Sequence, residues 1–305
     1  MDCIDLFAGL GGQTTGAVLA GHRVLWAANH WPVAVEYHSM NHPETIHSCQ
    51  DLQQADFSQV PAHDVLLASP CCQGHSKARG KNANRHDASR STAWAVVAAA
   101  EACRPQVLLV ENVPEFLEWS LYPAWADALQ RLGYTLAPHI VDAADYGVPQ
   151  HRVRLFLVGT RSARPLHLEL QKSVPVSARQ VIELDAGNWS PIHKPTRSAK
   201  TLARIERGRR DLRTDTFLIP YYGSGSGLTG RSLDRPIGTL TTRERWAVVR
   251  GDQMRMLTVE EQRDFMSFPA CTRLPKNKAL ATHLLGNAVA PELEKQLLTA
   301  IARAA

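Results

Sequence analysis

Two adjacent cysteines and one glutamate are the residues of this sequence best suited to chemistry. Cys71 and Cys72 follow an apolar run at residues 64–68, and Glu111 follows another at residues 106–110. A cysteine thiolate is a nucleophile, and a nearby cation or helix terminus raises the thiolate fraction. A buried glutamate has a raised pKa and can donate a proton near neutral pH. These residue types predict nucleophilic catalysis assisted by an acid. The alternatives are an inert buried cysteine and an ordinary strand-end carboxylate.

Two arginines open a later apolar run. Arg152 and Arg154 both lie at the start of the strand predicted at residues 152–158. Side chains alternate along a strand, so both arginines are expected on the same face. Two cations on one face need partners such as phosphate, carboxylate or an electron-rich carbonyl. The alternative is an exposed edge strand protected by charged residues.

A glycine-rich turn at residues 5–12 follows the first predicted strand and opens a helix. Glycines there let the backbone approach a nucleotide-like ligand, although a tight turn that binds nothing gives the same pattern. Nucleotide-binding folds usually place a carboxylate at the end of the second strand, where this chain has Asn29. Asp51, at the expected end of the third strand, is a candidate for holding an adenine amino group. Its alternative is a solvated loop acid or a helix cap.

The elements that must position these residues alternate between strands and helices in the first half of the chain. Such alternation predicts a parallel sheet covered on both faces. Strands are predicted at residues 3–7, 23–28, 64–68, 106–110, 134–141 and 152–158, and helices at residues 13–20, 32–40, 91–103, 122–132, 258–266 and 291–304.

The pattern changes after residue 159. Residues 161–234 contain scattered proline, glycine and charge, with few long apolar runs. We therefore predict an α/β domain at residues 1–160, completed by residues 281–305. A smaller irregular domain is predicted at residues 161–280, and the last helix returns to the first domain.

The positive charge is concentrated in two segments. The 305-residue chain has a formal net charge of +5 and a sequence pI of about 9.0. Residues 77–92 carry a net charge of +4 and residues 194–213 a net charge of +6, so the rest of the chain has a net charge of −5. These two basic segments are candidates for binding a polyanion, while a solvated helix face is the alternative for residues 194–213.

The class of protein is narrowed by what the sequence lacks. The six cysteines show no metal-ligand spacing, so no metal site is predicted, and they are too few for a disulfide scaffold. Neither a secretory signal nor an apolar run of the roughly 20 residues that span a membrane is recognisable. A reducing cytoplasm is the expected location.

Six motifs together resemble the DNA (cytosine-5) methyltransferases of bacteria and phages. They cover residues 3–295 in the order of that family, and only the segment between residues 159 and 235 lies outside them, where the family has its variable target-recognition region. The motifs are Phe-x-Gly-x-Gly from Phe7, Cys72-Gln73, Glu111-Asn112-Val113, Gln150-x-Arg152-x-Arg154, Arg235-Pro236-x-x-Thr239 and Gly286-Asn287-Ala288-Val289.

The resemblance implies an α/β, Rossmann-like methyltransferase fold with a mostly parallel sheet, and a target-recognition region at about residues 161–234. It also implies that a cytosine is flipped out of duplex DNA and that the Cys72 thiolate adds to C6. Glu111 would protonate or hydrogen-bond the N3/N4 edge, Arg154 would lie near the cytosine carbonyl, and Arg152 would lie beside it. Cys71 stands where relatives often have proline, which makes Cys72 the expected nucleophile.

S-adenosylmethionine is the cofactor that the resemblance implies. Its contacts carry over to residues of the glycine turn, of the ends of the next strands and of the last motif. The departures from the family pattern are Asn29 and His30. At the first of these positions the family usually has an acid that bonds the ribose hydroxyls. The implied cofactor-binding set is Phe7, Gly9, Leu10, Gly11, Asn29, His30, Asp51, Pro70 and Asn287.

Double-stranded DNA is the implied partner, bound through residues 77–92 and residues 194–213. We expect a monomer that acts alone or beside a cognate restriction endonuclease. Two other functions fit the same residues: a relative that methylates cytosine in RNA, and a catalytically silent DNA-binding protein. An intact set of Cys72, Glu111 and Arg154 argues against the silent protein.

Overall fold

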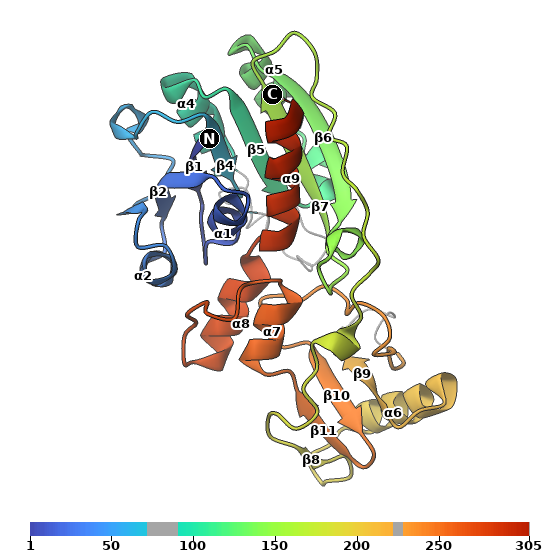
Figure 1. The fold of residues 1–305 in the computed structure, drawn as a ribbon. Coiled ribbons are helices and arrows are strands. Elements are labelled where there is room, and N and C mark those ends of the chain that lie inside the picture. The colour runs from blue at the N-terminus through green and yellow to red at the C-terminus, as the bar shows by residue number, and fades with distance from the viewer. Residues whose placement is uncertain (72–90, 222–227, 305) are drawn as a thin grey trace.

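The structure is a computed structural model that describes residues 1–71, 91–221 and 228–304 (Figure 1). Its largest element is a seven-stranded sheet with the strand order β3-β2-β1-β4-β5-β7-β6. The strands are β1 (Asp2–Leu6), β2 (Arg23–Asn29), β3 (Ile46–Cys49), β4 (Val65–Ala68), β5 (Val107–Asn112), β6 (Thr135–Asp142) and β7 (Val153–Thr160). All six strands predicted with residue ranges are therefore confirmed, and β3 is the third strand expected before Asp51 without a range.

The direction of the strands brings several chain segments to one edge of this sheet. The pairs β3–β2, β2–β1, β1–β4 and β4–β5 are parallel, whereas β7 runs antiparallel between β5 and β6. The strand order reverses at β1, from which the chain goes outward on one side to β2 and β3 and later on the other side to β4 and β5. Ligands of open α/β sheets bind at the carboxyl ends of the strands beside such a reversal.

Helices cover both faces of the sheet, as the continuous apolar runs of its strands require. On one face, Val65 and Leu67 of β4 belong to a core cluster with residues of α1 (Gly12–Leu19), α2 (Pro32–Asn41) and α9 (Pro291–Ala304). On the other face, Leu66 and Ala68 pack with α4 (Trp94–Cys103) and α5 (Tyr122–Arg131). The predicted α/β fold with a mostly parallel sheet is thus confirmed.

The C-terminal helix returns to the N-terminal one, as the sequence predicts. Figure 1 shows α9 lying beside α1, which stands at the other end of the sequence. Glycines permit this close approach: a Cβ atom at Gly12 would lie 2.0 Å from the Val289 carbonyl oxygen, and one at Gly16 would lie 2.4 Å from the Cβ of Glu294. Any side chain at Gly12 would push the last motif away from the glycine turn.

The smaller part of the molecule is more regular than the sequence predicts. It contains an antiparallel sheet with the order β8-β11-β10-β9 and a 14-residue helix, α6 (Ala199–Leu212). The strands are β8 (Ser190–Pro191), β9 (Thr216–Pro220), β10 (Trp246–Arg250) and β11 (Gln253–Met256). Only Thr201, Ile205 and Gly208 of α6 are buried. The apolar face of this helix is narrow and lies within a run of arginines, so the hydrophobicity pattern of the sequence does not predict the helix.

Two helices connect the two sheets. The chain passes from β11 into α7 (Val259–Phe265), which starts at a capping box made by Thr258 and Glu261, and then into α8 (Lys278–Asn287). The sequence predicts α7 and not α8. Short 3₁₀ helices are η1 (Phe57–Gln59), η4 (Pro114–Glu118), η5 (Ala143–Tyr146) and η6 (Ala178–Gln180). Within the described residues, none of the helices combines the length and apolar character needed to cross a membrane.

Candidate active site

The loop after β4 is held between the glycine turn and the end of β5. The Ser69 hydroxyl donates to the Phe7 carbonyl oxygen at 3.3 Å, and the Asn112 side-chain amide donates to the Pro70 carbonyl oxygen at 3.1 Å. The backbone N–H of Cys71 donates to the Thr92 hydroxyl at 3.2 Å. Cys72, the predicted nucleophile, lies outside the described residues. The residue before it is nevertheless placed at the carboxyl edge of the sheet.

Glu111 and Arg154 form a buried ion pair at the same edge. Glu111 lies near the end of β5 and is 7% exposed, and the Nε atom of Arg154 lies 3.0 Å from its Oε1 atom. The antiparallel register pairs Glu111 with Phe156, which brings Arg154 next to the carboxylate. Burial raises the pKa of Glu111, and the cations of Arg154 and Arg152 oppose that rise. The predicted acid therefore sits in surroundings that favour proton retention.

Arg152 is engaged differently from Arg154. Its side chain is 2% exposed, and its guanidinium donates to the carbonyl oxygens of Leu240, Gly286 and Ala288 at 2.9–3.2 Å. Arg152 directly precedes β7, which begins at Val153, and its cation, like that of Arg154, lowers the pKa of Glu111. The common face of the two arginines stays a prediction. The partners of Arg152 are backbone carbonyls of two distant motifs.

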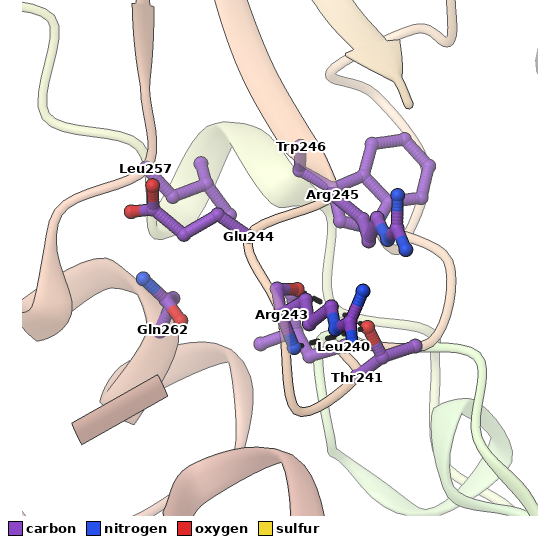
Figure 2. Close-up of a pocket in the computed structure, with 8 residues that line it drawn as sticks. All are labelled: Leu240, Thr241, Arg243, Glu244, Arg245, Trp246, Leu257 and Gln262. Atoms are coloured by element: carbon purple, nitrogen blue, oxygen red, sulfur yellow. Dashed lines mark hydrogen bonds between the residues drawn. The ribbon is translucent and has the colours of Figure 1, made fainter. Parts of the chain in front are cut away.

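The residues before Arg152 fix the loop that follows the Arg-Pro-x-x-Thr motif. The Gln150 side-chain carbonyl accepts the Leu240 N–H at 2.7 Å, and the Thr239 hydroxyl donates to the His151 carbonyl oxygen at 2.8 Å. Beyond this anchor the loop lines the pocket of Figure 2, where the exposed Arg243 follows Thr241. The pocket contains none of the predicted catalytic or cofactor-binding residues.

The glycine turn has the backbone geometry of a ligand-binding loop. Phe7, Gly9 and Gly11 all have positive φ, at 64°, 55° and 93°. The φ of Phe7 is unusual for a residue with a side chain, and such strain is frequent at functional sites. The Leu10 side chain is buried in the core, so Leu10 can offer only its backbone to a ligand.

The other predicted cofactor residues lie around the same edge. Asn29 ends β2, and its side-chain oxygen accepts the Trp31 N–H at 2.9 Å, which leaves its amide hydrogens for other contacts. His30 follows with an exposed side chain. Asp51 lies beyond β3 and accepts the Gln53 N–H at 3.0 Å. This bond also fits the alternative interpretation of Asp51 as a solvated loop acid. Asn287, at the end of α8, is exposed two residues before Val289, which packs against Gly12.

These residues fit an adenosine-containing cofactor in most respects. The turn leaves room above Gly9, since a Cβ atom there would have a single neighbour within 4 Å, at 3.8 Å. Exposed polar side chains stand at position 30 after β2, at position 51 after β3 and at position 287 at the end of α8. Gly11 has another explanation, because a Cβ atom there would lie 2.8 Å from the ring of His42.

Several residues that shape the site were not singled out by the sequence. Asp5 is fully buried in β1 below the glycine turn, and His38 and His42 pack beside that turn from α2. Asn112 ties β5 to the cysteine loop. Asp5 could have been found from the sequence, because a charged residue inside an otherwise apolar strand indicates a special role. The histidines gave no such indication, because their proximity to the turn depends on the packing of α2.

Comparison with known proteins decides the family. The family model described as C-5 cytosine-specific DNA methylase matches residues 1–303. This chain belongs to that family. It is 27% identical to the type II methyltransferase M.NlaX of Neisseria lactamica, over 94% of this chain and 91% of that protein. It is 34% identical to M.AgeI of Thalassovita gelatinovora over 52% of this chain, a match that spans only 39% of M.AgeI.

Solved structures agree with the fold of this C-5 cytosine-specific DNA methylase. A putative DNA modification methyltransferase encoded within an Escherichia coli prophage aligns with a TM-score of 0.72 at 21% identity, covering 100% of this chain and 99% of that one. A DNMT2 variant from Spodoptera frugiperda aligns with a TM-score of 0.70 at 18% identity, covering 99% of both chains. At these identities the likeness concerns the fold of the methylase alone.

Proposed function

We propose that this methylase transfers a methyl group to C5 of cytosine within a specific duplex DNA sequence, with S-adenosylmethionine as the methyl donor. The observation that carries the proposal is the buried Glu111–Arg154 pair. Through Asn112, the strand that bears Glu111 is tied to the segment that leads into Cys72. An acid and a cation thus lie at the edge of the sheet that also holds Pro70 and Cys71, the residues that lead into Cys72.

Cys72 is proposed as the nucleophile that makes cytosine reactive. The target base leaves the stack, because C6 cannot be reached inside the duplex. The thiolate of Cys72 then forms a bond to C6, and the electron pair of the C5–C6 double bond makes C5 nucleophilic. The cofactor supplies the methyl group that C5 takes up. Loss of the C5 proton and departure of the Cys72 thiolate restore the double bond and release 5-methylcytosine.

Glu111 is proposed to hold a proton at the N3/N4 edge of the base. Its raised pKa supports this role, because a carboxylic acid can donate where a carboxylate can only accept. The proton stabilises the negative charge that develops on the ring as Cys72 adds. Arg154 keeps Glu111 in place at 3.0 Å and is proposed to meet the cytosine carbonyl oxygen with its remaining N–H groups.

Arg152 is proposed to position the site. Its bonds to the carbonyl oxygens of Leu240, Gly286 and Ala288 join the segment before β7 to the two late motifs. The cofactor is proposed to lie on the glycine turn, with Phe7 against the adenine ring and His30, Asp51 and Asn287 around it. The side-chain oxygen of Asn29 accepts the Trp31 N–H, so its amide N–H groups remain as donors. They are proposed to donate to a ribose hydroxyl oxygen of the cofactor.

The DNA is proposed to meet the two basic segments. Residues 77–92 lie almost wholly outside the described residues. In the other segment, Arg209 is bonded to the Gly251 carbonyl and to Asp252, whereas Lys194 and Lys200 are exposed. We extend the proposed contact surface to Arg243 on the loop of Figure 2. Action as a monomer in the cytoplasm, beside a cognate restriction endonuclease, completes the proposal.

Bisulfite sequencing of DNA from a host that expresses the chain tests the function and reveals the recognised sequence. Protected cytosines at one recurring site are expected, and a Glu111→Gln variant should leave them unprotected. The same assay on transfer RNA separates an RNA methyltransferase from a DNA one. Incubation with duplex DNA containing 5-fluorocytosine should trap a covalent adduct. Absence of both protection and adduct would mean that the chain is a silent DNA-binding protein.

A further inference from the structure

Three histidines lie beside the glycine turn, outside the site described above. His38 lies in the last turn of α2, His42 is the residue that directly follows this helix, and His47 lies on β3. The ring of His38 is 4.9 Å from the rings of both others, measured between centroids. Within the part of the chain that the structure describes, no histidine, cysteine and acid side chains are grouped so that they could hold a metal ion. The cluster therefore needs another explanation.

A continuous series of hydrogen bonds connects this cluster to Asp5. His47 Nε2 lies 2.7 Å from His38 Nδ1, and His38 Nε2 lies 3.1 Å from the Thr14 hydroxyl oxygen. The Thr14 hydroxyl donates to Asp5 Oδ2 at 2.7 Å. His47 is half-buried, whereas His38, Thr14 and Asp5 are buried. The series thus runs from near the surface to a carboxyl group that water does not reach.

The number of hydrogens fixes the direction of each bond when Asp5 is ionised. Thr14 has a single hydroxyl hydrogen, which it gives to Asp5, so the hydrogen between Thr14 and His38 belongs to Nε2 of His38. A neutral His38 then has a lone pair on Nδ1, and Nε2–H of His47 donates to it. Burial and the neighbouring His42 and His47 lower the pKa of His38 well below its usual value, so His38 is neutral near pH 7.

Protonation of Asp5 can reverse the whole series. A proton that arrives at Nδ1 of His47 lets Nε2 release its hydrogen to Nδ1 of His38. Nε2 of His38 passes its hydrogen to Thr14, and Thr14 passes its own to Oδ2 of Asp5. Each intermediate group gains one hydrogen and loses one, so both histidines end neutral in the opposite tautomer. The net change is one proton bound by Asp5.

The surroundings of Asp5 determine the pH at which it binds this proton, which is near neutral. Burial raises the pKa of Asp5 to about 7, against the bond from Thr14, which lowers it. The titratable groups around it are Glu294 on α9, whose pKa burial and the charge of Asp5 raise, and Cys3 on the same strand. Oδ1 of Asp5 has no hydrogen-bond partner among the described residues. The chain through Thr14 is therefore the polar connection that the described structure gives this carboxyl group.

We propose that His47, His38 and Thr14 form a proton relay through which Asp5, buried below the glycine turn, gains and loses its proton, and that the charge of Asp5 tunes the preference for a cationic cofactor over its neutral product. The effect on binding rests on the proposed function. S-adenosylmethionine carries a sulfonium charge that its thioether product lacks. An ionised Asp5, two residues before Phe7, attracts the sulfonium cation, and a protonated Asp5 does not.

The relay can be tested in the protein without cofactor. Nitrogen NMR of the histidine rings, recorded together with the Asp5 carboxyl carbon, should show His38 and His47 changing from one neutral tautomer to the other as Asp5 titrates. Thr14→Ser keeps a hydroxyl and should retain this coupling, while Thr14→Val removes the hydroxyl at equal size and should abolish it. If the wild-type histidines keep one tautomer or become cations in that pH range, the relay is wrong. The wild-type titration decides this even where Thr14→Val does not fold.

Calorimetric titration tests the consequence for binding. The ratio of product Kd to S-adenosylmethionine Kd should rise with pH through the pKa of Asp5, by about tenfold for one charge at intermediate distance. Asp5→Asn should make the ratio independent of pH. His139→Gln is the matched control, since His139 is a half-buried histidine on β6 and should leave the dependence unchanged. A pH-independent wild-type ratio would overturn the charge effect. Failure to bind at any pH would refute the proposed function and leave the tautomer result standing.

Discussion

Burial and charge act in opposite directions on Glu111. Burial raises its pKa, while Arg154, at 3.0 Å, and Arg152 lower it. The balance leaves a carboxyl group that can both pair with a cation and carry a proton when the base arrives. The Arg154 side chain is 16% exposed, and its guanidinium also donates to the Val153 carbonyl oxygen at 2.7 Å. The same two residue types exposed on a surface would form an ordinary ion pair of little consequence.

Replacing Arg154 by glutamine should raise the pKa of Glu111 further, because burial remains and the opposing cation is lost. A group that must be protonated is active below its pKa, so the decline of the methylation rate at alkaline pH should shift to higher pH. We expect the maximal rate to fall about 10²- to 10³-fold, as for the loss of one charge-stabilising donor. A pH–rate profile measures both effects. An unshifted alkaline limb would show that Glu111 does not titrate in catalysis.

The two adjacent cysteines should differ completely in their effect on transfer. Neighbouring side chains of an extended segment point in opposite directions, so only one can face the base. Cys71 has its backbone tied to Thr92, and its replacement by alanine should largely preserve activity. Cys72→Ser should abolish methyl transfer and adduct formation with 5-fluorocytosine DNA. The reverse pattern in a methylation assay would assign the nucleophile to Cys71.

At the scale of elements, the site is assembled by loops that side chains tie together. Arg152 bonds three carbonyl oxygens from the loop after β9 and from the end of α8. Gln150 bonds the same loop and the Phe265 carbonyl at the end of α7. These buried bonds connect segments that are 88 to 136 residues apart. Closing such long loops costs conformational entropy, but this cost grows only slowly with the length of the loop. The motif around β7 therefore holds two parts of the molecule together.

Replacing Arg152 by glutamine should destabilise the protein strongly. The shorter side chain leaves buried carbonyl oxygens unpaired, at a cost of about 1–3 kcal/mol for each unsatisfied group. We expect the free energy of unfolding to fall by about 2–4 kcal/mol in denaturant titration. Arg131→Gln is the matched control, because Arg131 makes an exposed pair with Asp127 and its replacement should leave the free energy of unfolding nearly unchanged. Equal stability of the two variants would disprove the structural role of Arg152.

The sequence predicted the strands of the large sheet because their apolar runs are uninterrupted and turns separate them. It could not predict α8, whose buried residues lie between positions 281 and 286 and include a threonine and a glycine, nor the second sheet, whose core is only a few side chains. The candidate site residues were found by type and by motif order. The different engagement of Arg152 and Arg154 was not readable, because it depends on where β7 begins and on carbonyls from remote loops.

At the scale of the whole molecule, fewer of the positive charges of residues 194–213 are available to contact DNA than the sequence suggests. Figure 1 shows α6, which carries much of the basic segment 194–213, on the second sheet at the end of the molecule away from the termini. Arg197 and Arg207 of this segment donate to the carbonyl oxygens of Ile192 and Leu228, and Arg209 joins α6 to Asp252. Part of the +6 charge therefore stabilises the smaller domain, and the exposed lysines remain for phosphates.

Lys194→Gln and Lys200→Gln together should weaken DNA binding without changing stability. Each lysine that contacts a phosphate releases about one counterion, so the slope of log affinity against log salt should become shallower by about 1 for each lost contact. Fluorescence anisotropy at several salt concentrations measures this slope. Arg209→Gln removes the same formal charge from a side chain bonded to the Gly251 carbonyl, Glu206 and Asp252, so it should lower the unfolding free energy instead. If the two lysine replacements leave the salt slope at the wild-type value, α6 and the segment before it do not touch the phosphates. The DNA must then be held by the remaining basic surface, of which Arg243 is the first residue to replace.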